Sequence, residues 1–217
     1  MITLNPHEIS FPDPEKYHPP GGLIASGGDL SVERVYFAYE TGLFPWYNPG
    51  EEILWWCPDP RFVMFPDELK VSRSMQKIMN RELFRFTENQ CFRTVMEHCM
   101  RSERKHQDGT WINEDLIDTF TRLHEMGVAT SIEVWQNDAL AGGLYGVQMG
   151  GVFCGESMFS LVSNASKAGF IYFVQKYRHQ LDLIDCQIHS DHLESLGARM
   201  ISKAEYLKIL KKSNESR

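Results

Sequence analysis

The chain has 217 residues and a net charge of −7, and 42% of its residues are hydrophobic. This composition allows a packed core and excludes a disordered chain. The acidic balance argues against a large nucleic-acid surface, because phosphate binding needs clustered Lys and Arg, and it favours a cationic ligand. No stretch approaches about 18 uninterrupted apolar residues, and the N-terminus lacks a basic segment followed by an apolar run, so neither a membrane span nor a signal peptide is predicted.

The cysteines and histidines bear on compartment and metal binding. Five cysteines are present at wide spacing and without a Cys-x-x-Cys pair, which predicts reduced thiols in a cytoplasmic protein. His189 and His192 are close in sequence but lack a matching pair of partners, so no metal site is expected.

The first sixty residues differ in amino-acid composition from the rest of the chain. They contain nine of the ten prolines and several aromatic pairs, a pattern typical of a compact, loop-rich unit. One helix is predicted there, starting after Ser31, which can cap it, and ending at Gly42. We therefore expect a small N-terminal domain over residues 1–60 and a second domain over residues 61–217.

Regular elements follow residue 60. Helical periodicity is found behind Ser72 and between Asn113 and Gly127, and alternating strands with turns between them cover residues 131–135, 139–147 and 152–158. A long helix (164–180), a strand (183–189), a short helix (191–197), a short strand (198–201) and a helix capped by Ser202 and Glu205 complete the chain. The order predicts an α+β fold with a mainly antiparallel sheet flanked by helices.

The string Leu183-Ile-Asp-Cys-Gln-Ile-His189 is the first candidate site. As a strand it places Asp185, Gln187 and His189 on one face. A carboxylate in the middle of an apolar strand is costly unless it is paired. The pattern fits a functional acid–amide pair. It also fits a structural Asp whose hydrogen bonds are satisfied, or a strand with one solvent-exposed face.

Two neighbouring segments add further candidates. Glu156 follows Gly155 at the end of an apolar strand, and the glycines of Gly142-Gly-Leu-Tyr-Gly146 would let a backbone or ligand approach closely; a surface Glu on an edge strand is the alternative. Phe170 and Phe173 lie one turn apart in the long helix and could line a pocket or simply pack in the core.

Basic and aromatic residues suggest contacts with a nucleic acid. Arg73, Lys77 and Arg81 fall at i, i+4 and i+8, so they form a basic stripe on one helix, either a phosphate contact or a solvated face. Trp46 in Phe44-Pro-Trp46 and Trp111 in Asp108-Gly-Thr-Trp111 could stack on bases or anchor their loops in the core.

These strings occur together in one order. They include Leu23-Ile-Ala-Ser-Gly-Gly-Asp-Leu30, Gly42-Leu-Phe-Pro-Trp-Tyr47, Pro58-Asp-Pro-Arg61, Ser72-Arg-Ser-Met75, Ser131-Ile-Glu-Val-Trp135, Gly155-Glu-Ser-Met-Phe-Ser160, Asn164-Ala-Ser-Lys167 and Leu183-Ile-Asp-Cys-Gln187. Over roughly residues 4 to 210 the chain resembles the bacterial leucyl/phenylalanyl-tRNA–protein transferases. The resemblance rests on the number of motifs in sequence rather than on any single one.

The resemblance implies an activity and a fold. Such proteins move Leu or Phe, and less often Met, from aminoacyl-tRNA to the N-terminal Arg or Lys of an acceptor protein, which marks that protein for degradation by the N-degron route. The implied fold is a small N-terminal domain followed by a domain resembling the acetyltransferases called GNAT. The implied partners are aminoacyl-tRNA and acceptor proteins or peptides; no cofactor, DNA or membrane is implied.

The resemblance also implies roles for individual residues. Asp185, Gln187 and Glu156 would be the catalytic residues, and Trp46 and Trp111 would hold the terminal adenosine of the tRNA. The stripe of Arg73, Lys77 and Arg81 would contact the tRNA backbone. The pocket for the aminoacyl side chain would be lined by Leu144, Phe153, Phe170, Phe173 and Ile184. Leu144 in place of Met, and Phe170 in place of a smaller residue, could change the preference among Leu, Phe and Met.

Amide chemistry separates the roles of the acid and the amide. Gln187 is a poor base at physiological pH, so we expect it to orient the amine, and Asp185 to polarise it or to receive the proton. Asp185 and Glu156 together would attract a cationic acceptor. Replacing Asp185 with Ala is expected to abolish transfer while leaving folding intact.

Two other functions fit parts of the pattern. An acetyl-CoA-dependent transferase needs a glycine-rich loop before a helix to hold the pyrophosphate, but Ser160-Leu-Val-Ser-Asn164 contains no glycine. A non-catalytic tRNA- or peptide-binding module would not need an acid–amide pair beside a pocket. Both are disfavoured.

Overall fold

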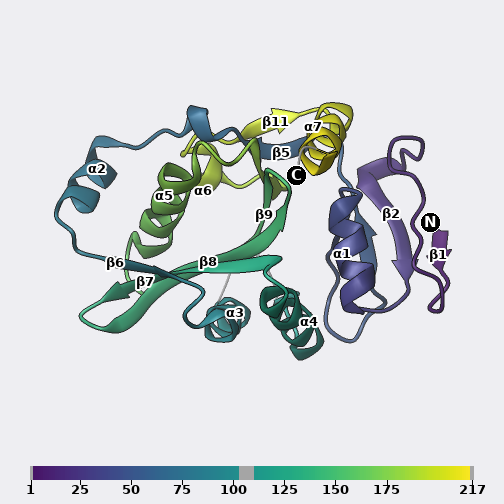
Figure 1. The fold of residues 1–217 in the computed structure, drawn as a ribbon, viewed down its shortest axis with the longest axis horizontal. Coiled ribbons are helices and arrows are strands. Elements are labelled where there is room, and N and C mark those ends of the chain that lie inside the picture. Colours follow the sequence, from purple (N-terminus) through teal and green to yellow (C-terminus); the bar gives the residue numbers. More distant parts are fainter. Residues whose placement is uncertain (1, 103–109, 216–217) are drawn as a thin grey trace.

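The computed structural model describes residues 2–102 and 110–215 and contains two β-sheets (Figure 1). The first has the strand order β1-β2-β4-β3 and the second has the order β11-β5-β10-β9-β8-β7-β6. In the second sheet β9 and β10 run parallel, and every other neighbouring pair is antiparallel. The predicted α+β class with a mainly antiparallel sheet is confirmed.

The smaller sheet is built from short strands within the proline-rich segment. Its elements are β1 (Ile2–Leu4), β2 (Leu23–Gly27), α1 (Val32–Glu40), β3 (Phe44–Pro45) and β4 (Leu54–Trp56). Ser31 precedes α1 as predicted, but its hydroxyl donates to Asp29 Oδ1 at 2.6 Å and makes no cap. Gly42 ends the helix with a left-handed φ of 86°, the conformation that favours glycine.

The larger sheet begins at residue 61. Its strands are β5 (Arg61–Met64), β6 (Arg85–Glu88), β7 (Ala129–Gln136), β8 (Ala139–Met149), β9 (Val152–Ser160), β10 (Leu183–Gln187) and β11 (Arg199–Ile201). The helices in this part of the chain are α2 (Arg73–Asn80), α3 (Phe92–Arg101), α4 (Glu114–Glu125), α5 (Ala165–Tyr177), α6 (Asp191–Glu194) and α7 (Lys203–Glu215).

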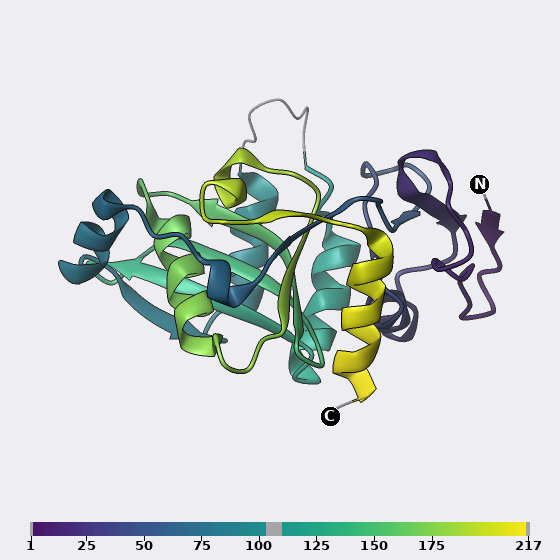
Figure 2. The same ribbon diagram turned by 90° about the horizontal axis from the view of Figure 1, so that it is seen from above.

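Helices cover both faces of the larger sheet. Helix α5 lies on one face, α3 and α4 lie on the other, and α2 projects at the end remote from the N-terminal sheet (Figure 1). Seen from above, α7 runs along the side of the molecule that adjoins the N-terminal unit (Figure 2). Several predicted helix starts are confirmed by side-chain caps: Ser72 accepts from Met75 N and Asn113 from Leu116 N.

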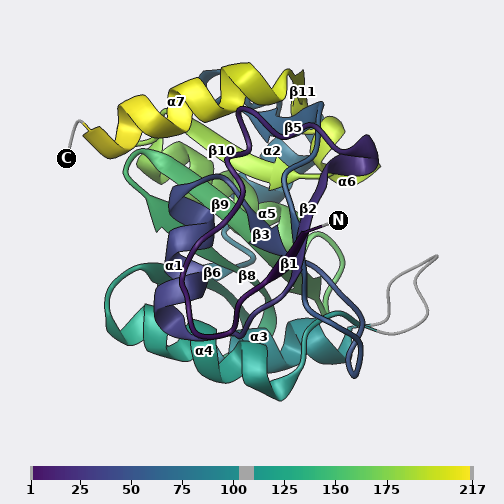
Figure 3. The same ribbon diagram turned by 90° about the vertical axis from the view of Figure 1, so that its right-hand side faces the viewer.

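One buried apolar cluster joins the two sheets. It contains Trp55 and Leu43 from the N-terminal unit (residues 2–60), together with Phe120, Tyr145 and Cys154 from the rest of the chain. Helix α1 lies between strand β2 and the larger sheet and contacts α4 and β8 (Figure 1), and Figure 3 views the same elements from the N-terminal side. The chain passes from the smaller to the larger sheet between β4 and β5, near the expected domain boundary. Because one apolar core spans both sheets, the division into two domains at residue 60 stays a prediction.

Two further findings concern the environment of the chain. All five cysteines are free, as predicted. Within residues 2–102 and 110–215, no helix has both the length and the apolar character needed to cross a membrane.

Candidate active site

A cavity of about 1200 Å³ opens where the parallel strands β9 and β10 separate. Their pairing ends where Asp185 lies opposite Cys154. Beyond that point both strands contribute to the cavity walls, together with β3, β8, α5 and α6. The residues that matter below are Phe44, Trp46, Trp111, Leu144, Phe153, Glu156, Met158, Phe170, Ile184 and Gln187.

Each of the two strands carries a β-bulge at this point. In β9, Gly155 and Ser157 pair with consecutive residues of β8, which leaves Glu156 as the extra residue. In β10, Asp185 and Gln187 pair with consecutive residues of β5, which leaves Cys186 as the extra residue. Bulges bend a strand and redirect side chains, and here they bring a carboxyl group and an amide together.

The polar centre of the cavity is the pair formed by Gln187 and Glu156. Gln187 Nε2 donates to Glu156 Oε1 at 2.7 Å, and Gln187 is only 8% exposed. Burial raises the pKa of Glu156 to about 8; the Tyr39 hydroxyl opposes this rise and the negative charge of Asp185 adds to it. The predicted proximity of these two site residues is therefore present in the structure.

Asp185 is also buried, but it does not line the cavity. Its carboxylate accepts hydrogen bonds from Arg61, at 2.8 and 2.6 Å, and from Tyr206, at 3.1 Å. The predicted shared face of Asp185, Gln187 and His189 is wrong, because the bulge at Cys186 and a left-handed φ of 59° at Gln187 break the alternation. Gln187 and His189 line the cavity and Asp185 lies behind it.

The pairing of Asp185 also changes the electrostatics that the sequence suggested. The positive charge of Arg61 balances the Asp185 carboxylate, so Asp185 and Glu156 do not form a joint acidic patch. Burial alone would lower the pKa of Arg61, but the charge of Asp185 raises it well above its ordinary value. Among the described residues that line the cavity, Glu156 is the one with a carboxyl group.

The apolar wall agrees with the predicted side-chain pocket except at one position. Leu144, Phe153, Phe170 and Ile184 all line the cavity. Phe173 does not: its ring lies behind Phe153, at 4.3 Å between ring centroids, because it faces the sheet from α5. Met158, which the sequence did not single out, completes the wall; its position in Gly155-Glu-Ser-Met158 was the available signal.

Both candidate tryptophans line the cavity together with Phe44 and Pro45. Trp46 packs on Trp56 with ring centroids 5.8 Å apart, and Trp111 is 7% exposed. Asp108 and Gly109 of the predicted Trp111 loop lie outside the described residues. The tryptophans thus contribute both to packing and to the cavity rim.

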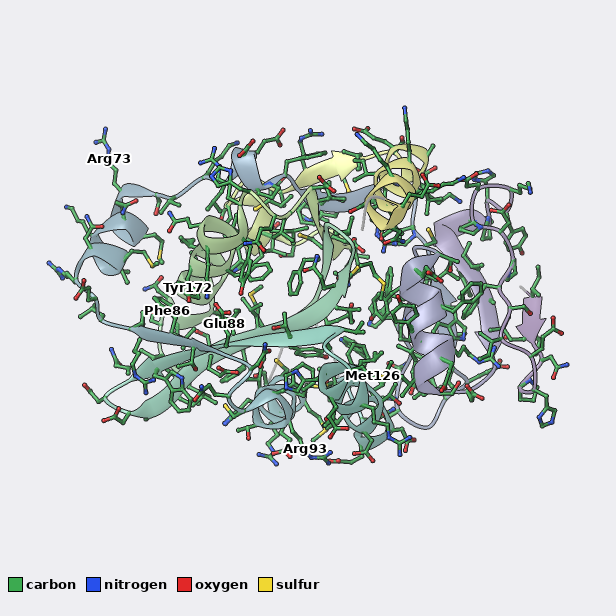
Figure 4. All side chains as sticks on the ribbon, in the orientation of Figure 1. Arg73, Phe86, Glu88, Arg93, Met126 and Tyr172 are labelled. Carbon is green, nitrogen blue, oxygen red and sulfur yellow. The ribbon has the colours of Figure 1, made fainter. Side chains whose placement is uncertain are left out.

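The basic stripe lies apart from the cavity, on α2. Arg73, Lys77 and Arg81 are exposed, and none of them forms an ion pair within the part of the chain that the structure describes. Arg73 points outward from the molecule, whereas Phe86, Glu88 and Tyr172 lie together where β6 meets α5 (Figure 4). The stripe faces solvent and is available to a partner.

The glycines of β8 serve close packing within the protein. A Cβ at Gly146 would lie 2.3 Å from the carbonyl oxygen of Cys154 and 2.5 Å from the Phe153 ring. A Cβ at Gly142 would lie 2.8 Å from Ala165 Cβ. These glycines therefore let the pocket residue Phe153 and helix α5 approach the sheet, rather than admitting a ligand to this stretch of backbone.

One group of potential metal ligands lies at the edge of the cavity. Among the residues described, His189, Asp191 and Glu194 are close enough to share a cation, and His189 Nε2 lies 3.2 Å from Glu194 Oε2. All three side chains are exposed, and exposed acidic groups of this kind are common without an ion. We assign no metal to them.

Comparison with solved structures gives matches of low similarity. A GCN5-related N-acetyltransferase-like protein from Streptococcus suis has a TM-score of 0.39 and 13% identity, covering 66% of this chain and 57% of that chain. A GCN5-related N-acetyltransferase from Kribbella flavida has a TM-score of 0.40 and 9% identity, covering 77% of this chain and 60% of that chain. Similarities of this size support no inference about chemistry.

Comparison of sequences is more informative. The family model for leucyl/phenylalanyl-tRNA protein transferase matches residues 63–211, and the model for its N-terminal domain matches residues 28–59. Curated transferases of this name are similar throughout. The protein from Flavobacterium johnsoniae is 51% identical over 88% of this chain and 90% of its own length, and that from Escherichia coli O1:K1 is 49% identical over 97% and 89%. The chain belongs to the leucyl/phenylalanyl-tRNA–protein transferase family and is an aminoacyltransferase that moves an amino acid from tRNA to proteins.

Proposed function

We propose that this protein transfers Leu or Phe, and less often Met, from aminoacyl-tRNA to the N-terminal Arg or Lys of acceptor proteins in the cytoplasm, and so marks them for N-degron degradation. The observation that carries the proposal is the Gln187–Glu156 pair at the centre of a cavity with one apolar wall. Such a cavity offers an apolar side chain a place beside a polar pair that can contact the reacting amine.

The reaction is aminolysis of an activated ester: the acceptor amine forms an amide bond with the ester carbonyl carbon, the bond from that carbon to the tRNA ribose oxygen breaks, and the proton lost by the amine passes to the leaving ribose oxygen. The protein has to position the two reactants and move that proton. The amide of Gln187 donates to Glu156 and keeps its own oxygen as an acceptor for the attacking amine. Glu156 is the better proton acceptor of the two carboxyl groups, because it lines the cavity and its pKa of about 8 lies near that of an α-amine. Asp185, which the sequence suggested for that role, is proposed to act through Gln187 from outside the cavity.

The apolar wall supports the proposed amino acids. Leu144, Phe153, Phe170 and Ile184 offer only hydrocarbon and ring surface to a side chain. A pocket of this kind accepts long apolar side chains and discriminates among them mainly by shape, with factors of about 10 to 200 for a methylene. Unbranched-β residues such as Leu, Phe and Met fit this description better than Val or Ile.

The aromatic rim and the basic stripe support a tRNA as the donor. Trp46 and Trp111 are proposed to hold the terminal adenosine, because aromatic rings stack on a base regardless of its identity. Arg73, Lys77 and Arg81 are proposed to contact the tRNA backbone, which would confine the phosphate contacts of an acidic protein to one edge.

Charge reversal at the stripe tests the backbone contact. Lys77→Glu should weaken binding of charged tRNA several-fold at about 50 mM salt and much less at about 200 mM, because each lost phosphate contact reduces the salt slope by about one unit. Binding would be measured by filter retention across salt concentrations. Lys208→Glu, on the exposed side of α7, is the matched control and should leave the slope unchanged; an unchanged slope for Lys77→Glu would show the stripe to be a solvated face.

The overall proposal is tested by transfer of radiolabelled Leu, Phe, Met and, as a β-branched comparison, Val from tRNA to peptides that begin with Arg, Lys or Ala. Label should appear on the Arg and Lys peptides and not on the Ala peptide. Equal labelling of all three would refute the proposed acceptor preference, and labelling from Val-tRNA equal to that from Phe-tRNA would refute the proposed pocket.

A further inference from the structure

Behind the cavity lies a fully buried arginine that the proposed reaction does not use directly. Arg61 on β5 is 1% exposed, and its Nε and Nη2 atoms donate to the two carboxylate oxygens of Asp185. The guanidinium lies over the rings of Phe44 and Tyr206, at 4.8 and 4.4 Å from their centroids. A planar fork suits this two-pronged contact, which the single ammonium group of a lysine could not reproduce.

The carboxylate that Arg61 holds has a second task. Asp185 Oδ1 also accepts a hydrogen bond from the backbone N–H of Gln187, at 2.9 Å. That residue has a φ of 59°, in the left-handed region that residues with a side chain rarely adopt. The hydrogen bond therefore supports the unusual backbone conformation that points the Gln187 side chain into the cavity.

Tyr206 on α7 completes the arrangement. Its hydroxyl donates to Asp185 Oδ2 at 3.1 Å, and Arg61 Nη2 lies 3.4 Å from the same hydroxyl oxygen. The carboxylate thus has partners from β5, α7 and its own strand, which leaves it little freedom to rotate. A chain of contacts runs from Arg61 through Asp185 and Gln187 to Glu156.

We propose that Arg61 is a positioning residue for aminoacyl transfer. By fixing the Asp185 carboxylate, together with Tyr206, it holds the left-handed backbone at Gln187 and so sets the direction in which the Gln187 amide faces the reacting amine. The proposal rests on the role proposed above for Gln187. A positioning role differs from a purely stabilising one in its effect on kcat: substitution of Arg61 should lower kcat only while Gln187 is present.

A double-mutant cycle separates these two possibilities. Arg61→Lys should lower kcat about tenfold to a hundredfold, because a displacement of about 1 Å in a positioning group can cost that much, and should leave KM for aminoacyl-tRNA within about twofold. In a Gln187→Ala background, Arg61→Lys should have no further effect on kcat, because the group it positions is gone. Both constants would be measured by steady-state transfer from Phe-tRNA over a range of Phe-tRNA concentrations.

Arg34 offers a matched control for the substitution itself. It is also fully buried and paired with a carboxylate, Asp29, but it lies in the N-terminal unit with the backbone carbonyls of Asn5 and Pro6 as further partners. Arg34→Lys should leave kcat unchanged in both backgrounds. If Arg61→Lys fails to fold, Tyr206→Phe takes its place, since it removes one hydrogen bond to Asp185 and keeps the ring under the guanidinium.

Each outcome has a definite reading. Non-additive effects of Arg61→Lys and Gln187→Ala support the proposal. Gln187→Ala with wild-type activity would refute the role of Gln187 and the proposal with it. The third outcome is that Gln187→Ala lowers kcat, and that Arg61→Lys lowers kcat by the same factor with and without Gln187. That outcome would refute only the role of Arg61.

Discussion

Replacing Asp185 with alanine should lower the free energy of unfolding by about 3–5 kcal/mol, which is the usual cost of leaving a buried charge without its partner. Arg61 is 1% exposed, and Asp185 supplies both of its charged contacts. For the Asp185→Ala variant, the buried pair with Arg61 therefore adds an expected loss of stability to the loss of transfer that the sequence predicts. Urea denaturation followed by circular dichroism measures the effect.

The matched control is Asp29→Ala, which also unpairs a buried arginine. Arg34 would keep the backbone carbonyls of Asn5 and Pro6 as acceptors, at 3.1 and 3.2 Å, so the expected loss is only about 1 kcal/mol. The combined substitution Arg61→Met and Asp185→Leu removes both charges and should regain most of the lost stability. It should not regain activity, because the Gln187 N–H would still lack its acceptor. Equal losses for Asp185→Ala and Asp29→Ala would contradict this account.

Replacing Glu156 with glutamine should make the protein more stable at pH 8 than the wild type, and less active. The pKa of Glu156 rises from 4.5 to about 8 because of burial. Between these two values the folded protein holds a proton that the unfolded chain has lost, so the wild type should lose stability as the pH rises. With about 1.4 kcal/mol for each unit of difference, the loss between pH 5 and pH 8 is about 3 kcal/mol.

The glutamine variant isolates this contribution. Glutamine has nearly the same shape as glutamic acid and does not titrate. Between pH 5 and pH 8 the free energy of unfolding of the variant should therefore fall by about 3 kcal/mol less than that of the wild type. Urea titrations of both proteins at pH 5 and pH 8 give the comparison, and Glu194→Gln, at an exposed position, should behave like the wild type. Parallel pH profiles for wild type and Glu156→Gln would show that the Glu156 carboxyl does not titrate in this range.

The sequence was sufficient wherever periodicity and capping act over several turns. The helices behind Ser72 and Asn113 begin where their caps predict, with hydrogen bonds from Met75 and Leu116 to the cap side chains. Helix α3 was not predicted although Phe92, Val95, Met96 and Cys99 have helical spacing and are all buried. The strands of the smaller sheet have two to five residues each, too few for alternation to be recognised.

The sequence predicted which residues form the candidate site better than it predicted how they are arranged. Motif resemblance named Asp185, Gln187, Glu156 and most of the pocket, whereas strand alternation put Asp185 and Gln187 on one face, and in the structure only Gln187 of those two lines the cavity. An extra residue in a strand carries no compositional mark, so the bulges at Glu156 and Cys186 could not be read from the sequence. Arg61 appeared only within the string Pro58-Asp-Pro-Arg61, because its partner is 124 positions away.

The apolar core that runs through both sheets has a consequence for dissecting this enzyme. Phe44 and Trp46 from the first sixty residues line the cavity, and the Tyr39 hydroxyl acts on the carboxyl group of Glu156. A fragment that starts at residue 61 would lack part of the wall of the candidate active-site cavity and would expose the surface on which Trp55 and Leu43 pack. We therefore expect the two portions, expressed separately, to be inactive alone and to regain transfer activity when they reassemble, as in fragment complementation.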